Sequence, residues 1–231
     1  MEFTLLWAAL LAVGAIWLML WFERRLGLGP DERSFDTVLG ATVFGLVAGR
    51  IAAMLLTGTN PVTHPADIIL IRGGVDTGFA SLGALGFLAW ATRRSLPATL
   101  DLMSPAILAG LAGWHGGCVF RGTCLGTRSD LPWAVAQPGS DLTRHPTELY
   151  AALLFLLAAG GLLLVVRRIG RGGLPAGLAL AAAGLIRLIT EPMRPSLGSG
   201  PVWWYTSAIV LGITLAGMAL FRRAPDGRNE G

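Results

Sequence analysis

The stretch LPAGLALAAAGLIRLI, Leu174–Ile189, is an apolar run of membrane-spanning character that contains a single arginine, Arg187. A second run, TVFGLVAGRIAAMLL over Thr42–Leu56, contains Arg50 in the same way. A charged side chain at the centre of a bilayer costs at least about 2.5–3.5 kcal/mol, so such residues are rare and usually functional. We therefore interpret both arginines as candidates for holding an anion in a buried site that lipid can reach.

The rest of the chain has the composition of a membrane protein. Of its 231 residues, 53% are hydrophobic and 14% are charged, whereas an ordinary soluble domain is about 25% charged. A helix needs about 20 mostly apolar residues to cross a bilayer, and seven segments come close to this length. The sequence therefore predicts an all-α polytopic membrane protein with seven transmembrane helices in one domain, residues 1–231. The predicted spans are Phe3–Phe22, Thr37–Leu56, Thr77–Ala91, Leu100–Phe120, Glu148–Val166, Leu174–Ile189 and Val202–Phe221.

The loops between these spans alternate in charge, and this predicts the topology, because cytoplasmic loops carry an excess of basic residues. We expect the N-terminus outside, the C-terminus in the cytoplasm, and the long loops Thr57–Asp76 and Arg121–Thr147 outside. The pI near 10 does not indicate nucleic-acid binding, since topology accounts for most of the arginines. The expected cytoplasmic group is Arg24, Arg25, Arg33, Arg93, Arg94, Arg167, Arg168, Arg171, Arg222, Arg223 and Arg228. The smaller outer group is Arg72, Arg121, Arg128, Arg144 and Arg194.

The polar chemistry of the chain is concentrated at the end of the outer loop Arg121–Thr147. There the sequence His145-Pro146-Thr147-Glu148-Leu149-Tyr150 leads into the fifth predicted span. We regard His145 as a candidate for proton transfer, because imidazole gains and loses a proton near neutral pH. The alternative is a structural histidine at a helix cap or interface, since proline and threonine are typical of a helix start.

A second polar cluster closes the sixth predicted span. Arg187 and Glu191 are four residues apart and share a helix face, and Arg194 follows three residues later. One interpretation is a self-contained ladder of ion pairs, and the other is an arginine held ready for an anion. For Arg50 the alternative is a tightly packed helix crossing in which the guanidinium bonds to carbonyl groups, because Gly49 and other small residues surround it.

The two cysteines, Cys118 and Cys124, lie near the outer end of the fourth predicted span. Two cysteines without further ligands do not make a structural zinc site. A disulfide is chemically possible on the oxidising side of the membrane. We favour the interpretation that both are small residues that serve helix packing.

Several segments match, in order and spacing, the motifs of one known family. His145–Tyr150 resembles a His-Pro-(Ser/Thr)-Gln-Leu-Tyr element, and Ile186–Arg194 resembles a Phe-Arg-x-x-x-Glu-x-x-Arg element. Gly49-Arg50-Ile51 resembles a Gly-Gly-Arg-Ile stretch, and Gly117–Gly126 resembles the signature loop. Gly73–Val75 and Leu131–Val135 add shorter matches. By these motifs the chain resembles the phosphatidylglycerol–prolipoprotein diacylglyceryl transferases over nearly its whole length, which implies seven spans and an outside N-terminus.

The resemblance implies transfer of a diacylglyceryl group from phosphatidylglycerol, or another anionic phospholipid, to the cysteine thiol of a lipobox-containing prolipoprotein. It also implies a multi-pass protein of the bacterial plasma (inner) membrane and requires no metal or cofactor. Arg187 is the expected phosphate binder, because a guanidinium forks onto phosphate oxygens. His145 or His115 would accept the thiol proton, and Glu191 would orient the arginine beside it. The other expected substrate-binding residues are Arg121, Arg144, Arg194, Tyr150 and Arg50.

The chain also departs from the pattern of this family. His115 stands where the signature loop of the family has an arginine, and Glu148 stands where the family has glutamine. The third span begins with Phe79–Gly83 and lacks the family's histidine there. Two alternatives therefore stay open. One is a degenerate, non-catalytic homologue that binds anionic lipid or lipoprotein, and the other is a lipid-dependent transferase with a different acceptor.

Overall fold

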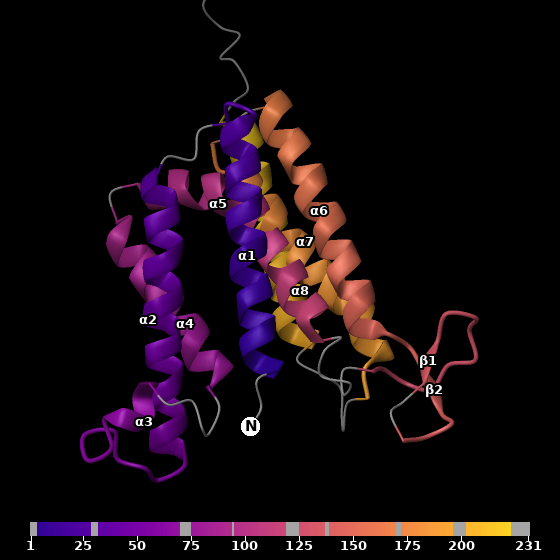
Figure 1. Ribbon diagram of the computed structural model, residues 1–231. Coiled ribbons are helices and arrows are strands. Elements are labelled where there is room, and N and C mark those ends of the chain that lie inside the picture. Colours follow the sequence, from indigo (N-terminus) through magenta and orange to yellow (C-terminus); the bar gives the residue numbers. More distant parts are fainter. Residues whose placement is uncertain are drawn as a thin grey trace, which may run out of the picture.

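The structure is a computed structural model that describes residues 4–28, 32–69, 75–93, 95–118, 125–136, 139–169, 172–195 and 202–222. Figure 1 shows a bundle of long helices with a small β-hairpin projecting from one end. The long helices are α1 (Thr4–Arg25), α2 (Glu32–Leu56), α4 (Thr77–Ala91), α5 (Leu96–Gly117), α6 (Thr147–Ile169), α7 (Leu174–Thr190) and α8 (Val202–Phe221). The short elements are α3 (Ala66–Ile69), η2 (Glu191–Met193) and the antiparallel strands β1 (Val135–Ala136) and β2 (Thr143–Arg144).

Within the described residues, six of these helices are long and apolar enough to cross a membrane, and α4 is a shorter apolar helix. The chain is therefore an all-helical, multi-pass membrane protein, as its composition predicts. Each predicted span overlaps one of the long helices, but several helices start earlier than expected. α2 begins at Glu32 rather than Thr37, and α5 begins at Leu96 rather than Leu100. A helix can continue beyond the apolar segment because it satisfies its backbone hydrogen bonds internally.

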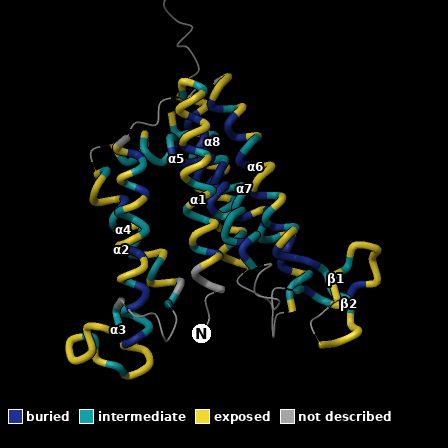
Figure 2. Tube along the Cα trace, viewed as in Figure 1, coloured by how far each residue is buried: buried dark blue, intermediate teal, exposed yellow. Residues whose placement is uncertain are grey.

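The helices pack in three close pairs, α1 with α5, α2 with α4, and α7 with α8. α5 also packs on α6 and α7, and buried residues of these three helices, Leu108, Phe155 and Ile186 among them, form the main apolar core. α2 meets the rest of the bundle through a smaller contact with α1, so α2, α3 and α4 lie to one side in Figure 1. Figure 2 shows burial concentrated along α5, α6 and α7 and exposed residues around the outside.

Glycines allow the close approach within each pair. A Cβ atom on Gly83 of α4 would lie 2.6 Å from the Cβ atom of Ala48, and one on Gly117 of α5 would lie 2.5 Å from the Cα atom of Ala8. A Cβ atom on Gly184 of α7 would lie 2.6 Å from the carbonyl oxygen of Tyr205 in α8. These small residues let backbones touch where lipid offers no hydrophobic driving force, which is how membrane helices commonly associate.

A buried carboxylate fixes α5 to the beginning of α7. Asp101 accepts hydrogen bonds from the backbone nitrogens of Gly172 at 2.8 Å, Ala176 at 3.1 Å and Gly173. Gly173 adopts a φ of 89°, a left-handed conformation that favours glycine. The contact satisfies amides that the first turn of a helix leaves unpaired, and a negative charge is favourable there. Asp101 thereby sets the position of α7 against α5 at the end opposite the polar cluster described below.

Candidate active site

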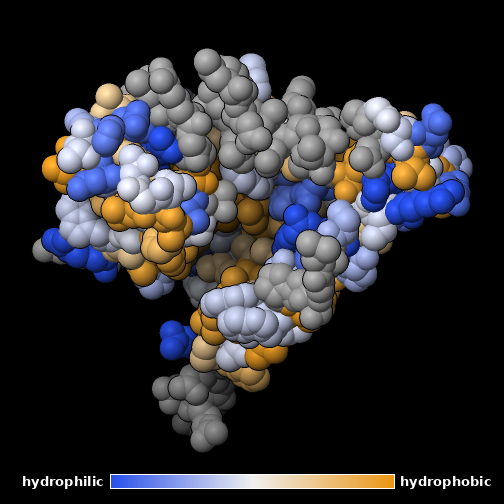
Figure 3. Space-filling view, turned by 90° about the horizontal axis from the view of Figure 1, so that it is seen from below, coloured by the Kyte–Doolittle hydropathy of each residue, from blue (hydrophilic) through white to orange (hydrophobic). Residues whose placement is uncertain are grey.

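Five ionisable side chains meet where α5 ends and α6 begins. They come from three helices and the turn that follows α7, so the fold assembles them from segments far apart in the sequence. In Figure 3 this end of the molecule is hollowed, with hydrophobic residues in the depth of the hollow and hydrophilic residues along one edge. The five are His115 of α5, Glu148 of α6, Arg187 of α7, Glu191 of η2 and Arg194.

His115 and Glu148 form a close buried pair. Nδ1 of His115 lies 2.5 Å from Oε2 of Glu148, and each residue is 8% exposed. The imidazole stacks on the ring of Phe155, with centroids 5.3 Å apart and planes 10° from parallel. Since an ionised carboxylate can only accept, Nδ1 is the donor, and the pair fixes both the tautomer and the orientation of the ring. Nε2 is then the ring nitrogen that can accept or release a proton.

Arg194 bridges the two carboxylates of the cluster. Its Nη2 atom lies 3.1 Å from Oε1 of Glu148, and its Nη1 atom lies 3.6 Å from Oε2 of Glu191. Glu148 therefore uses one oxygen for His115 and the other for Arg194. The two glutamates are balanced by two arginines, so an anion that enters the cluster meets no net excess of negative charge from these four side chains.

Arg187 is held on one side only. Its Nη2 atom lies 3.4 Å from Oε2 of Glu191 and donates to the hydroxyl of Tyr205 at 3.2 Å. The same hydroxyl donates to Oε2 of Glu191 at 3.2 Å. The other terminal nitrogen, Nη1, is buried and has no hydrogen-bond partner among the described residues. An unsatisfied buried cationic donor is costly, so Nη1 marks a position that an anionic oxygen would fill.

The second histidine lies in a separate group. Nδ1 of His145 is 3.5 Å from the hydroxyl of Tyr150, and the two rings meet edge to face with centroids 6.1 Å apart. Trp133 donates from Nε1 to the same hydroxyl at 2.8 Å. The backbone of His145 pairs with Gly126 and Thr127, which fastens the hairpin to the start of α6. His145 is therefore partly a structural residue, as one of the two interpretations expected.

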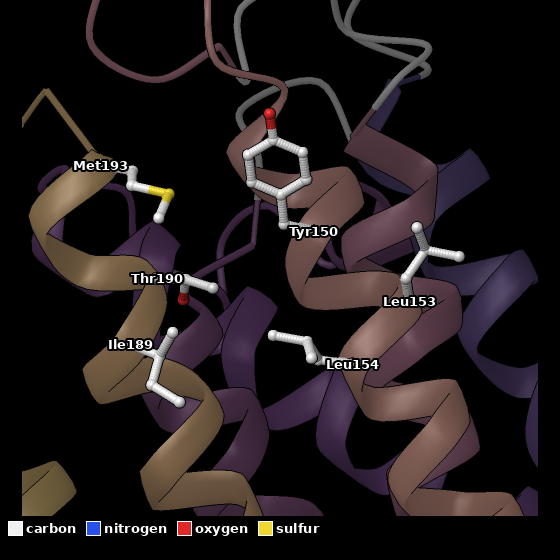
Figure 4. A pocket seen from close by; sticks show the side chains of 6 residues that line it. All are labelled: Tyr150, Leu153, Leu154, Ile189, Thr190 and Met193. Carbon is white, nitrogen blue, oxygen red and sulfur yellow. The ribbon is translucent and has the colours of Figure 1, made fainter. Parts of the chain in front are cut away.

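An apolar groove of about 280 Å³ runs between α6 and α7 beside this group. Figure 4 shows the hydroxyl end of Tyr150 at one end of the groove and aliphatic side chains along both walls. The lining is apolar, and its α7 wall lies within one turn of Arg187 in the sequence. The lining residues are Tyr150, Leu153, Leu154, Ile189, Thr190 and Met193.

Two of the residues expected to bind substrate contact backbone carbonyl oxygens. Arg50 lies near the end of α2 and donates from Nε to the carbonyl oxygen of Asp67 at 2.8 Å, which matches the carbonyl-bonded alternative. Arg144 lies in β2 and donates from Nη1 to the carbonyl oxygen of Gly126 at 3.1 Å. Arg121 lies outside the described residues.

The structure changes our interpretation of Cys118 and adds Tyr205 to the site. Cys118 is disulfide-bonded, which corrects our interpretation of it as a packing residue, and Cys124 lies outside the described residues. Tyr205 was missed because it follows Trp203 and Trp204 at the start of an apolar span, where an aromatic residue is typical of the membrane interface. Tyrosine is rare in this chain, which contains two, and both lie at this end of the bundle. That rarity was the feature of the sequence that could have pointed to Tyr205.

Comparison with known proteins agrees with the motifs. A sequence model of the family described as prolipoprotein diacylglyceryl transferase matches residues 1–223. The phosphatidylglycerol–prolipoprotein diacylglyceryl transferase of Methylocella silvestris is 34% identical over 189 residues, which cover 73% of this chain and 67% of that protein. The protein of the same name from Shewanella sp. (strain MR-4) is 28% identical over 231 residues, which cover 94% of this chain and 85% of the relative. The chain therefore belongs to the prolipoprotein diacylglyceryl transferase family.

Proposed function

We propose that the protein transfers a diacylglyceryl group from phosphatidylglycerol to the cysteine thiol of a lipobox-containing prolipoprotein. The acceptor sulfur attacks the diacylglyceryl carbon that carries the phosphate oxygen. A carbon–sulfur bond forms, the carbon–oxygen bond breaks, and glycerol phosphate leaves with the bonding electron pair. The thiol proton goes to a base of the protein, because the thiolate is the nucleophile.

The buried, unpartnered Nη1 atom of Arg187 is the observation that carries this proposal. The reaction develops negative charge on the phosphate oxygens of the leaving group. A guanidinium fixed beside them stabilises that charge without reorganising during the reaction. Arg194 contributes a second cation, since its side chain is partly exposed and already close to Glu148 and Glu191.

His115 is the base that the geometry favours. Nδ1 is engaged by Glu148, which leaves Nε2 to take the thiol proton, and the carboxylate stabilises the imidazolium that forms. His145 is the less suitable of the two candidates, because its ring nitrogen is directed at Tyr150 and its backbone anchors the hairpin. In this assignment Glu191 positions Arg187 and Arg194 rather than reacting itself.

The groove between α6 and α7 suits an acyl chain of the donor. It is apolar, and it lies beside the helix that carries Arg187, so one lipid can place its phosphate at the guanidinium and a chain along the groove. We further propose that all seven long helices span the bacterial plasma (inner) membrane, with the N-terminus and the active site on the outer side. The support for this orientation is the arginine excess in the loops at the opposite end.

One feature of the sequence favours a second candidate function. The start of α4 carries Phe79–Gly83 where the family carries a histidine, so a group that assists the reaction elsewhere in the family is missing. A homologue that binds anionic lipid without transferring it would keep the Arg187 site and lose turnover.

The test uses purified protein, phosphatidylglycerol labelled in its headgroup glycerol, and a lipobox peptide. We expect a thioether lipopeptide together with an equal amount of labelled glycerol phosphate. A peptide with serine in place of the lipobox cysteine is the matched control and should yield neither product. Lipid binding without thioether above the level of an Arg187→Gln variant would identify a binding homologue instead.

A further inference from the structure

We infer that Tyr205 is a positioning residue that holds the guanidinium of Arg187 so that Nη1 faces the lipid phosphate. The inference rests on the proposed function of Arg187 as the phosphate binder. Tyr205 does not touch the substrate in this assignment and acts only through the arginine.

The hydroxyl of Tyr205 forms hydrogen bonds with both Arg187 and Glu191. It accepts from Nη2 of Arg187 at 3.2 Å and donates its single proton to Oε2 of Glu191 at 3.2 Å. Arg187 and Glu191 are themselves 3.4 Å apart, which is long for a charge-assisted hydrogen bond. The hydroxyl therefore bridges Arg187 and Glu191. Its two hydrogen bonds replace part of the direct hydrogen bonding that a closer ion pair would make.

The ring of Tyr205 fixes the plane of the guanidinium as well. Cζ of Arg187 lies 5.5 Å from the ring centroid, within the range of a cation–π contact. A guanidinium held by one nitrogen and by a ring has a restricted orientation. Without these contacts the guanidinium of Arg187 could rotate until both Nη1 and Nη2 donate to the carboxylate of Glu191. That bidentate ion pair would compete with the lipid phosphate for Nη1.

The close approach of α7 and α8 brings Tyr205 within reach of Arg187. Gly184 lies one turn before Arg187 on α7, and a Cβ atom there would meet the carbonyl oxygen of Tyr205 at 2.6 Å. Trp203 and Trp204 precede Tyr205 and are 61% and 60% exposed, as expected for residues at a membrane interface. Tyr205 is only half-buried and turns toward α7, so its environment differs from that of the two tryptophans beside it.

The test compares Tyr205→Phe with Thr206→Val. Both variants remove one hydroxyl from the same turn of α8, but the hydroxyl of Thr206 donates to the backbone carbonyl oxygens of Val202 and Trp203 in its own helix. Affinity is measured by calorimetric titration of dioctanoyl phosphatidylglycerol into the purified full-length protein, with dioctanoyl phosphatidylcholine as the uncharged-headgroup reference. Thermal melting of each variant confirms that it is folded.

We expect Tyr205→Phe to weaken phosphatidylglycerol binding about tenfold, as for the loss of one hydrogen bond to a charged group. KM for the lipid should rise by a similar factor and kcat should fall as well, because Arg187 both binds the phosphate and stabilises the charge that develops on it as it leaves. Thr206→Val should match the parent. In an Arg187→Gln background, adding Tyr205→Phe should change nothing further, because the residue acts through the arginine.

Two results would overturn the inference alone. One is equal phosphatidylglycerol affinity of Tyr205→Phe and Thr206→Val while Arg187→Gln is defective. The other is an undiminished effect of Tyr205→Phe in the Arg187→Gln background, which would reveal a role in packing. Normal binding and activity of the Arg187→Gln protein would instead remove the phosphate binder from the proposed function, and the inference about Tyr205 would fall with it.

Discussion

Nδ1 of His115 lies 2.5 Å from Oε2 of Glu148, and these are two of the positions at which the chain departs from its family. The family motifs that the sequence resembles have arginine at the first position and glutamine at the second. The structure therefore places two departures in direct contact, across 33 positions of sequence. We interpret them as one coupled replacement, because in this chain the two side chains form a single buried hydrogen-bonded pair.

The coupling predicts the behaviour of a double variant. His115→Arg removes the proposed base and should lower turnover about 10²–10⁴-fold, and Glu148→Gln should lower it at least about tenfold. Because Glu148 acts through His115, the double variant should lose little more turnover than His115→Arg alone. Contacting residues commonly show interaction energies of about 0.5–3 kcal/mol, so the loss in the double variant should fall short of the product of the two single losses by between twofold and roughly a hundredfold. The measurement is thioether formation. Leu149→Ala, at an exposed neighbouring position, is the control, and strictly multiplicative losses would contradict the coupling.

The two histidines of the site are expected to differ in importance. His115→Ala removes the proposed base and should lower turnover about 10²–10⁴-fold, the range typical of general base catalysis. His145→Ala leaves the backbone bonds of the hairpin in place and should cost less than about tenfold on the same scale. His64→Ala is the control, since His64 is an exposed residue bonded to Thr63. A larger loss for His145 than for His115 would reverse the assignment.

The sequence predicted the helices well because apolar length is a local property. Each predicted span overlaps a helix, and the family motifs single out Arg187, Glu191 and Arg194 from the sequence alone. The short helix α3 and the hairpin were not predicted, because four-residue and two-residue elements leave no periodic pattern.

The remaining features depend on contacts between segments far apart in the chain. Nothing local distinguishes Tyr205 from an interface aromatic, since its role comes from α7 lying against α8. Arg50 and Arg187 look alike in sequence, yet one donates to the backbone of α3 and the other keeps a buried nitrogen without a partner among the described residues. An arginine within an apolar run indicates that the charge has a role, but the run does not distinguish a structural role from an anion-binding one.

The phosphate role of Arg187 is tested by two substitutions of different chemistry. Arg187→Gln removes the charge and should abolish specific binding of phosphatidylglycerol over phosphatidylcholine. Arg187→Lys keeps the charge but loses the planar fork, so it should retain only part of the affinity. Membrane insertion should not suffer in either protein, because Arg187→Gln removes a charge from a span, which makes insertion easier, and Arg187→Lys adds none. Selective lipid binding by Arg187→Gln would argue against the assignment.

The topology is tested independently of activity. A reporter fused in the loop before Thr147 should read outside the cell, and a reporter fused after Gly231 should read cytoplasmic. The reason is the arginine excess on the opposite side of the predicted spans. A third fusion, between α4 and α5 near Thr92, should read cytoplasmic only if the short helix α4 crosses the membrane. An outside signal there would reduce the number of spans.

Asp101 should prove important for stability rather than for chemistry. Its carboxylate is 1% exposed and accepts from the amides of Gly172, Gly173 and Ala176. Asp101→Ala leaves these donors unpaired in a buried position, and each such group costs about 1–3 kcal/mol. We expect a lower melting temperature in detergent and a loss of activity in proportion to the unfolded fraction. Asp101→Asn keeps one acceptor oxygen and should fall between the parent and Asp101→Ala. A large loss of turnover in Asp101→Asn at an unchanged melting temperature would mean that the position of α7, and with it Arg187, is adjusted by this cap.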